Sequence, residues 1–303
     1  MCIRDRVFAD QVPDESPRTG ARPSGSGIVF EGVVDGWIHD VHVRNAPRFG
    51  VFLDGSARIT VSDAEIAGAQ DRGEGGYGYA LHLFQSQNVL VRDTTVRDAR
   101  HGVVIQGPAA SMIALSGVRS QANRFGDDTH HALSHAILWD DYQLRDGTGL
   151  HLYYRGAKSD GAHETVGDTV VWNVRGDGIA DGWLSDGIYL NPAHSGRAVV
   201  AGSPGEHAIY SGTRVGLGEA GNRIPGHRVP LQRGPQRDPF AEEPAPGSRE
   251  ANVLYTHLHR PAKPRSLFRA QARARLGRVP FAPRACPPAV ANGERGDPQR
   301  MAR

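Results

Sequence analysis

The 303-residue chain has few of the residues that would tie a fold together covalently or hold it in a membrane. Its two cysteines, Cys2 and Cys286, lie outside the repeated part of the sequence, which excludes a disulfide framework or a cysteine-based metal motif there. No apolar run approaches the ~20 residues that cross a bilayer. We therefore expect no membrane span.

The first residues also lack the apolar stretch of a signal peptide. Met1–Arg6 reads as a translated adaptor sequence, so we expect a truncated N-terminus. The missing signal then says nothing about export.

Lysine is nearly absent, because 33 of the 35 basic residues are arginine and only Lys158 and Lys263 are lysine. Residues 1–220 hold 19 basic and 27 acidic residues, a balance of −8, whereas residues 221–303 hold 16 and 6, a balance of +10. The body is acidic and the basic tail carries no recognised motif. We therefore expect no nucleic-acid partner.

Glycine (38) and proline (20) are abundant, as in turn-rich β proteins. Four stretches can be laid over one another, each with a short apolar strand, a polar corner and a second, alternating strand. They are residues 27–46, 50–69, 80–99 and 102–122. Strand-only repeats of roughly 20–30 residues predict a parallel β-helix, in which each coil buries its apolar face on its neighbours.

Composition shifts divide the chain further. We expect an irregular lead-in (1–26), a parallel β-helix (27–220), an irregular Pro/Gly-rich strap (221–263), a helix (264–278) and a disordered tail (279–303). In the helix, apolar residues recur at helical spacing, with Ser266 as the N-cap and Gly277 at the end.

Residues 127–173 concentrate the side chains that carry chemistry, including five of the 14 histidines. Period-2 alternation in the stretch from Gly149 to Gly156 predicts that Leu150, Leu152 and Tyr154 face the core. The alternate residues His151, Tyr153 and Arg155 then form an outward polar row that meets a ligand lying along the stack.

Three interpretations of this segment remain open. The first is a metal site, as zinc on Asp127 or Asp128 with His130, His131 and His135, or as calcium on Asp128, Asp140 or Asp141. The second is a catalytic groove. The third is inert packing of histidine and tryptophan between an insertion and the coils.

The stretches DDTHHALSHAILWDD (127–141), YYRGAKSDGAHETVGDTVVWNV (153–174) and PRSLFRAQARARLG (264–277) carry a family likeness. Together they resemble right-handed parallel β-helix proteins of the pectin lyase-like superfamily, in its uncharacterised bacterial polysaccharide lyase-like branch. This chain departs from the pattern at Ala162-His163-Glu164, where glycines usually flank the histidine. The resemblance implies an all-β, right-handed parallel β-helix with a short C-terminal helix, in an extracellular or periplasmic protein.

The leading hypothesis is a secreted bacterial lyase that cleaves an acidic polysaccharide by β-elimination. This reaction needs a cation on the uronate carboxylate and a base beside it. We assign Arg155 to the carboxylate, His163 or His131 to the base, Tyr153 to the acid, and Lys158 as a second cation. The predicted substrate-binding residues are His130, His135, His151, Trp139, Asp140 and Asp141, and calcium is the candidate cofactor.

Two alternatives stay open beside the lyase. One is a glycoside hydrolase that uses Asp127 or Asp128 with Asp140 or Asp141. The other is a non-catalytic, carbohydrate-binding or adhesive β-helix, for which tryptophans would supply stacking platforms. These tryptophans are Trp37, Trp139, Trp172 and Trp183. The sequence does not set the oligomeric state.

Overall fold

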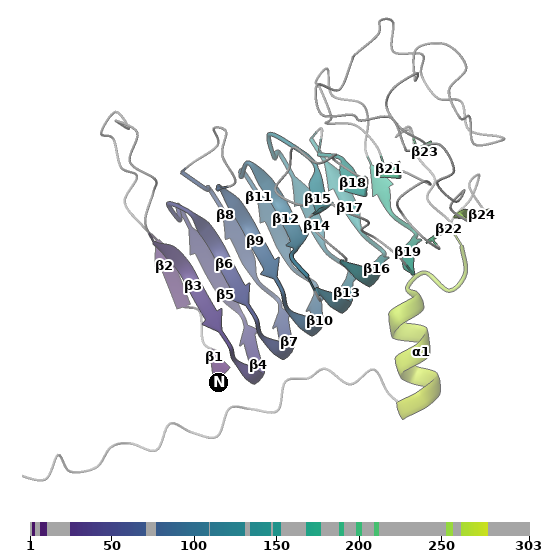
Figure 1. Cartoon of the computed structure of the whole chain (residues 1–303), viewed down its shortest axis with the longest axis horizontal. Helices are drawn as coiled ribbons and strands as arrows, with labels where there is room; N and C mark the ends of the chain where they lie inside the picture. Colours follow the sequence, from purple (N-terminus) through teal and green to yellow (C-terminus); the bar gives the residue numbers. More distant parts are fainter. Residues whose placement is uncertain are drawn as a thin grey trace, which may run out of the picture.

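The chain winds into a stack of coils bounded by three sheets, A, B and C, in which every strand pairing among the described residues is parallel (Figure 1). The computed structural model describes residues 2–3, 7–10, 25–70, 77–108, 110–130, 134–146, 148–152, 168–176, 188–190, 198–201, 209–211, 253–256 and 262–277. Up to β22 the strands of each sheet lie three apart in chain order, so each of these coils adds one strand to each sheet; the last pairs, β22 with β24 and β21 with β23, lie two apart. The predicted all-β fold class, a parallel β-helix with a short C-terminal helix, is confirmed.

Sheet A consists of β1 (Cys2–Ile3), β4 (Val34–His39), β7 (Ala57–Ser62), β10 (Gln87–Arg92), β13 (Ser111–Ser116), β16 (His135–Asp140), β19 (Thr169–Trp172), β22 (Ala198–Ala201) and β24 (Val253–Thr256). Sheet B consists of β2 (Val7–Asp10), β5 (Val41–Arg44), β8 (Glu65–Ala67), β11 (Thr95–Arg97), β14 (Arg119–Gln121), β17 (Gln143–Arg145) and β20 (Arg175–Gly176). Sheet C consists of β3 (Ser26–Glu31), β6 (Phe49–Asp54), β9 (Tyr79–Phe84), β12 (His101–Gln106), β15 (Asp127–His130), β18 (Leu150–Leu152), β21 (Ile188–Leu190) and β23 (Ile209–Ser211).

The register of sheet C reproduces the overlay of the repeats. The pairs on either side of them place Gly27, Gly50, Ala80 and Gly102 at one position of successive coils. A Cβ on Gly50 would lie 2.2 Å from Cγ2 of Ile66 and 2.5 Å from the carbonyl oxygen of Ala80. Sheets B and C therefore approach too closely here for more than a very small residue.

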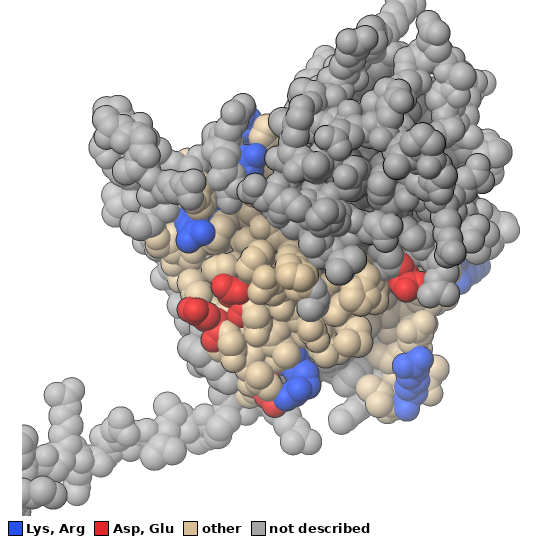
Figure 2. All heavy atoms as spheres, viewed as in Figure 1, with Lys and Arg blue, Asp and Glu red and all other residues tan. Residues whose placement is uncertain are grey.

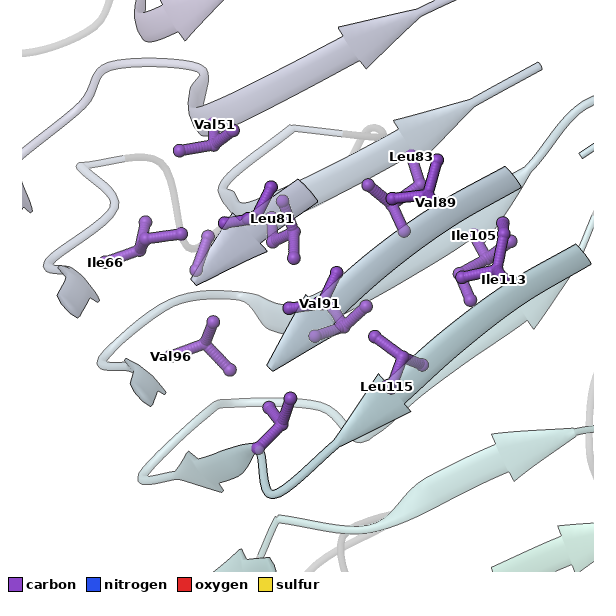
Figure 3. Packing of buried hydrophobic residues seen from close by; sticks show 14 of the residues in the cluster. Val51, Ile66, Leu81, Leu83, Val89, Val91, Val96, Ile105, Ile113 and Leu115 are labelled. Atoms are coloured by element: carbon purple, nitrogen blue, oxygen red, sulfur yellow. The ribbon is translucent and has the colours of Figure 1, made fainter. Parts of the chain in front are cut away.

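Inward-facing aliphatic residues fill the coils in continuous rows (Figure 3). In sheet A, Val61, Val91 and Leu115 stack in register, and in sheet C Leu81 stacks between Val51 and Val103. Each fully buried side chain of this kind stabilises the fold by roughly 1.5–3 kcal/mol. Core-facing and other residues alternate along each strand because only one face of the strand points into this core.

The corners between the sheets turn through residues with a left-handed backbone. Asp40, Asp63, Asp93, Asp141 and Asn173 follow β4, β7, β10, β16 and β19 of sheet A, with φ between 48° and 53°, and Gly117 follows β13 with φ of 71°. Aspartate and asparagine tolerate this conformation better than other non-glycine residues, because their short side chains hydrogen-bond locally. The left-handed backbone at the corners thus explains why Asp and Asn so often follow a strand.

Two segments expected to be irregular contain strands. β1 and β2 lie within residues 1–26 and pair with β4 and β5, and β24 lies within 221–263 and pairs with β22. The physical reason is that the ends of a stack leave unpaired backbone groups, which short runs rich in β-branched or aromatic residues satisfy by pairing. The expected tail, 279–303, lies outside the described residues.

The C-terminal helix α1 (Leu267–Leu276) begins and ends where the sequence indicated. The side chain of Ser266 accepts a hydrogen bond from the amide of Arg269, and Gly277 closes the helix with φ of 66°. In Figure 1 the helix lies beside the stack rather than within it. Across the described part of the chain, no helix has the length and apolarity that a membrane crossing requires.

Candidate functional site

The outer face of sheet C carries an aromatic cluster built from separate coils. We call Phe49, Phe52, Tyr77, Tyr79 and His82 the sheet C cluster. Phe49 comes from β6 and stacks on Tyr79 of β9 with ring centroids 5.4 Å apart, and His82 stacks on Phe52 at 4.9 Å. These offset and edge contacts are the favoured geometries of aromatic pairs.

The rings of this cluster differ in exposure. Phe49, Tyr79 and His82 are only 2%, 3% and 4% exposed, whereas Phe52 and Tyr77 are half-buried. The inner rings therefore hold the outer two in place, and the result is a rigid platform with aromatic edges open to solvent. Two half-buried rings, Phe84 and Phe125, extend it along the stack through contacts with His82 and His101.

One row of residues connects this cluster to the segment in which chemistry was predicted. In sheet C, Phe52 lies in register with His82, then Val104, Asp128 and His151 in successive coils. Leu150 beside His151 is fully buried in the core, as the alternation predicted. The strand that directly precedes residue 153 in the chain thus belongs to the same sheet as the aromatic cluster.

Charge is distributed unevenly over this face. Figure 2 shows a mostly uncharged surface, with basic side chains near the start of the sheet C strands and acidic ones near the ends of β3 and β6. Glu31 and Asp54 lie in register at the acidic end. Burial raises the pKa of Asp54 above its usual range, and the neighbouring Glu31 raises it further.

Asp127 lies inside the core rather than on this face. It occupies the inward position that Val103 holds in the preceding coil and Leu150 in the next. Oδ1 accepts hydrogen bonds from the amide of Val103 at 2.8 Å and from Ser120 at 2.9 Å, while Oδ2 accepts one from Tyr142 at 2.5 Å. Burial raises the pKa of Asp127 to about 6, and these hydrogen bonds oppose the rise.

Asp140 and Asp141, expected to bind substrate, bind the C-terminal segment instead. Asp140 accepts hydrogen bonds from Ser266 at 2.5 Å and from the amide of Leu267 at 2.7 Å. Asp141 pairs with Arg265 at 2.9 Å and with Arg175. Both carboxylates lie at the corner between sheets A and B, away from the outer face of sheet C.

The tryptophans that the structure describes do not form one common platform. Trp139, expected to bind substrate, is fully buried at an inward position of β16 and packs on Tyr142 with centroids 5.1 Å apart. Trp172 is half-buried and donates a hydrogen bond to the carbonyl of Pro264 at 2.9 Å. Trp37 is half-buried on the outer face of sheet A, and Trp183 lies outside the described residues.

The remaining predicted residues are placed only in part. His135 is exposed at the start of β16 in sheet A, and Asp128 is fully buried in β15. His130 and His151 lie on strands of sheet C. The residues predicted for catalysis, namely His131, Tyr153, Arg155, Lys158 and His163, lie outside the described residues.

No group of three or more His, Cys, Asp or Glu side chains within the described ranges is arranged to hold a metal ion. Protein donors already occupy both oxygens of Asp127. The described residues therefore do not supply the set of free oxygen ligands that calcium prefers.

The sheet C cluster was absent from the sequence prediction, although the repeats contain a signal for it. Phe49, Tyr79 and His101 each directly precede the small residue at which the repeats align. Reading one residue earlier in each repeat would have predicted an aromatic column.

The chain was compared with protein-family models, with curated proteins and with solved structures, and none of the three comparisons finds a match. The fold and the described contacts are therefore the basis for a functional proposal.

Proposed function

We propose that this protein is a polysaccharide-active β-helix that holds an acidic glycan along the outer face of sheet C. The observation that carries the proposal is the sheet C cluster, a rigid aromatic surface that continues from coil to coil. A sugar ring presents an apolar face that packs on such rings, and an elongated sheet offers successive contacts to successive sugars. The sequence resemblance to the pectin lyase-like superfamily supports the same class.

Within this class we propose a lyase reaction, because its predicted residues come shortly after β18 of this sheet in the chain. Arg155 would neutralise the uronate carboxylate and His163 would remove the adjacent proton, in the roles given above. The base takes the proton, and the electrons of the carbon–hydrogen bond form a carbon–carbon double bond. The glycosidic carbon–oxygen bond breaks at the same time, and its electrons stay on the departing sugar oxygen.

The contacts of the aspartates give less support to a hydrolase. Asp127 is inside the core, and Asp140 and Asp141 are engaged by the C-terminal segment at another corner. A hydrolase needs its two carboxyl groups on either side of one glycosidic bond. A non-catalytic binder remains the second candidate, since the aromatic surface alone suffices for it.

A screen of acidic and neutral polysaccharides against the full chain tests the proposal. A rise in ultraviolet absorbance from unsaturated ends supports the lyase, new reducing ends without that rise support the hydrolase, and binding without turnover supports the binder. Phe52→Ala should weaken binding about five-fold, since a lost aromatic contact costs about 1 kcal/mol. Val34→Ala, which removes an exposed apolar side chain from sheet A, is the matched control and should leave binding unchanged. Absence of binding to any glycan would refute the proposal.

A further inference from the structure

Arg48 and Arg100 lie at equivalent positions of two coils, each at the start of a sheet C strand, with one coil between them. The amide of Gly78 donates to the carbonyl of Arg48, and the amide of Arg100 donates to the carbonyl of Gly78, each at 2.8 Å. The arginine positions are thus separated by two strand spacings, roughly 10 Å. Gly78, at the same position of the middle coil, has no side chain, and the rings of its neighbours Tyr77 and Tyr79 lie against Arg48 and Arg100.

Both guanidinium groups lie against aromatic rings. Cζ of Arg48 is 4.8 Å from the ring centroid of Phe49 and 4.9 Å from that of Tyr77. Cζ of Arg100 is 5.3 Å from the centroid of Phe125 and 5.9 Å from that of Tyr79. A guanidinium that packs on rings keeps the donors at its edge available for a carboxylate in its plane.

These two arginines also differ from their neighbours in pairing. Arg58 and Arg97, on the other two sheets, bind Asp35 and Glu65 at 2.6 Å and 2.7 Å. Neither Arg48 nor Arg100 forms an ion pair in the part of the chain that the structure describes, and Nη1 of Arg100 contacts the hydroxyl of Tyr79 at 3.5 Å. An arginine that has no carboxylate partner in the protein can form a charge-assisted hydrogen bond with an anionic ligand, and such bonds are stronger than neutral ones.

We infer that Arg48 and Arg100 form a subsite for the carboxylate groups of the acidic glycan, an assignment that rests on the proposed function. The half-buried rings of Tyr77 and Phe125 beside them supply apolar contact for the sugar. Glu31 and Asp54 at the other end of β3 and β6 repel carboxylates. The anionic edge of the glycan is thereby directed to the arginine end, and phosphate, which lacks the sugar ring, gains less from this surface.

The test measures binding of the full chain to the acidic polysaccharide that binds most tightly in the screen, and to the same polymer after chemical reduction of its carboxyl groups. The Arg48→Gln/Arg100→Gln double variant should lose at least ten-fold in affinity for the acidic form and little for the reduced form. Arg58→Gln, an exposed arginine on sheet A, is the control and should bind as the wild type does. Thermal unfolding checks that all variants fold.

Each other outcome overturns the subsite. If the double variant keeps its affinity for the acidic polymer, the glycan binds the face without these arginines and only the proposed function stands. If both polymer forms lose affinity equally, the arginines support the rings rather than recognise charge. If inorganic polyphosphate binds as tightly and loses as much, the site is a general polyanion site. If no polysaccharide binds the wild type, the proposed function falls with it.

Discussion

The hydroxyl of Tyr142 donates a 2.5 Å hydrogen bond to Asp127 inside the core of the β-helix. Both side chains are fully buried, and both occupy inward positions that neighbouring coils fill with aliphatic residues. Ser120, which also donates to Asp127, replaces the valine of the preceding coil, Val96, in the same way. A polar layer therefore interrupts the apolar core directly before the coils that lead to the predicted catalytic segment.

The polar layer makes stability depend on pH. Burial raises the pKa of Asp127 from its ordinary 3.8 to about 6, so the folded chain holds this proton more tightly than the unfolded chain. The contribution to stability is complete below about pH 4 and is lost as the pH rises through 6, a change of about 3 kcal/mol. Asp127→Asn should remove this part of the pH dependence. Urea unfolding from pH 4 to pH 7 measures it, and parallel curves for the two proteins would contradict the assignment.

Removing the tyrosine hydroxyl isolates the hydrogen bond itself. Tyr142→Phe keeps the ring on Trp139 but leaves Oδ2 of Asp127 without this donor. The unfolding free energy at neutral pH should fall by about 1–3 kcal/mol, because a buried acceptor loses its partner. The pKa of Asp127 should rise further, since this hydrogen bond favours the ionised form. An unchanged unfolding midpoint at pH 7 would show that the hydroxyl is dispensable.

Position 50 requires glycine because neighbouring atoms leave no space for a side chain. The Cβ of an alanine there would meet Ile66 and the backbone of Ala80 at distances that real atoms do not adopt, so the coils must separate locally. Gly50→Ala should destabilise the fold by about 1–3 kcal/mol. Gly55→Ala is the matched control, because that position has open space and only a positive φ of 54°, for which about 1 kcal/mol is expected. Chemical unfolding compares the two, and an equal or smaller loss at Gly50 would contradict the close approach of the sheets.

The stacking was predictable because a β-helix repeats the same burial requirement in every coil. Gly27, Gly50, Ala80 and Gly102 could be aligned by eye, since the close approach of sheets B and C selects a small residue each time. The helix was predictable from a local signal, the serine cap and the closing glycine. Strand β24 was missed because its partner β22 precedes it by some fifty residues, and local composition carries no record of that pairing.

The candidate site was predicted less well, for the same physical reason. Asp140 and Trp139 were grouped with a ligand by residue type, but alternation along β16 turns Trp139 into the core. Asp140 is occupied by Ser266, 126 residues away in the chain, and no pattern near either residue indicates that contact. The roles predicted for Arg155 and His163 stay predictions, since both lie outside the described residues.

The C-terminal segment is fastened to the stack chiefly through Asp140. This buried carboxylate accepts hydrogen bonds from Ser116, from Ser266 and from the amide of Leu267, and so joins β13, β16 and the start of α1. A second contact involves Arg265, the residue before Ser266, whose carbonyl accepts a hydrogen bond from the side chain of Asn173 at 2.7 Å. Replacing Asp140 removes the acceptor that these three donors share.

Asp140→Ala should therefore loosen α1 without unwinding the coils. Losing hydrogen bonds to a buried carboxylate costs about 1–3 kcal/mol, which corresponds to roughly five- to hundred-fold faster tryptic cleavage after Arg273 or Arg275 when cleavage follows undocking. Asp98→Ala is the matched control, because that half-buried carboxylate pairs with Arg97 on sheet B and does not contact the segment. Timed proteolysis with mass analysis of the released peptides gives the rates. Equal cleavage of both variants and the wild type would mean that Asp140 does not hold the helix, and that the contacts of Asn173 and Arg265 are sufficient.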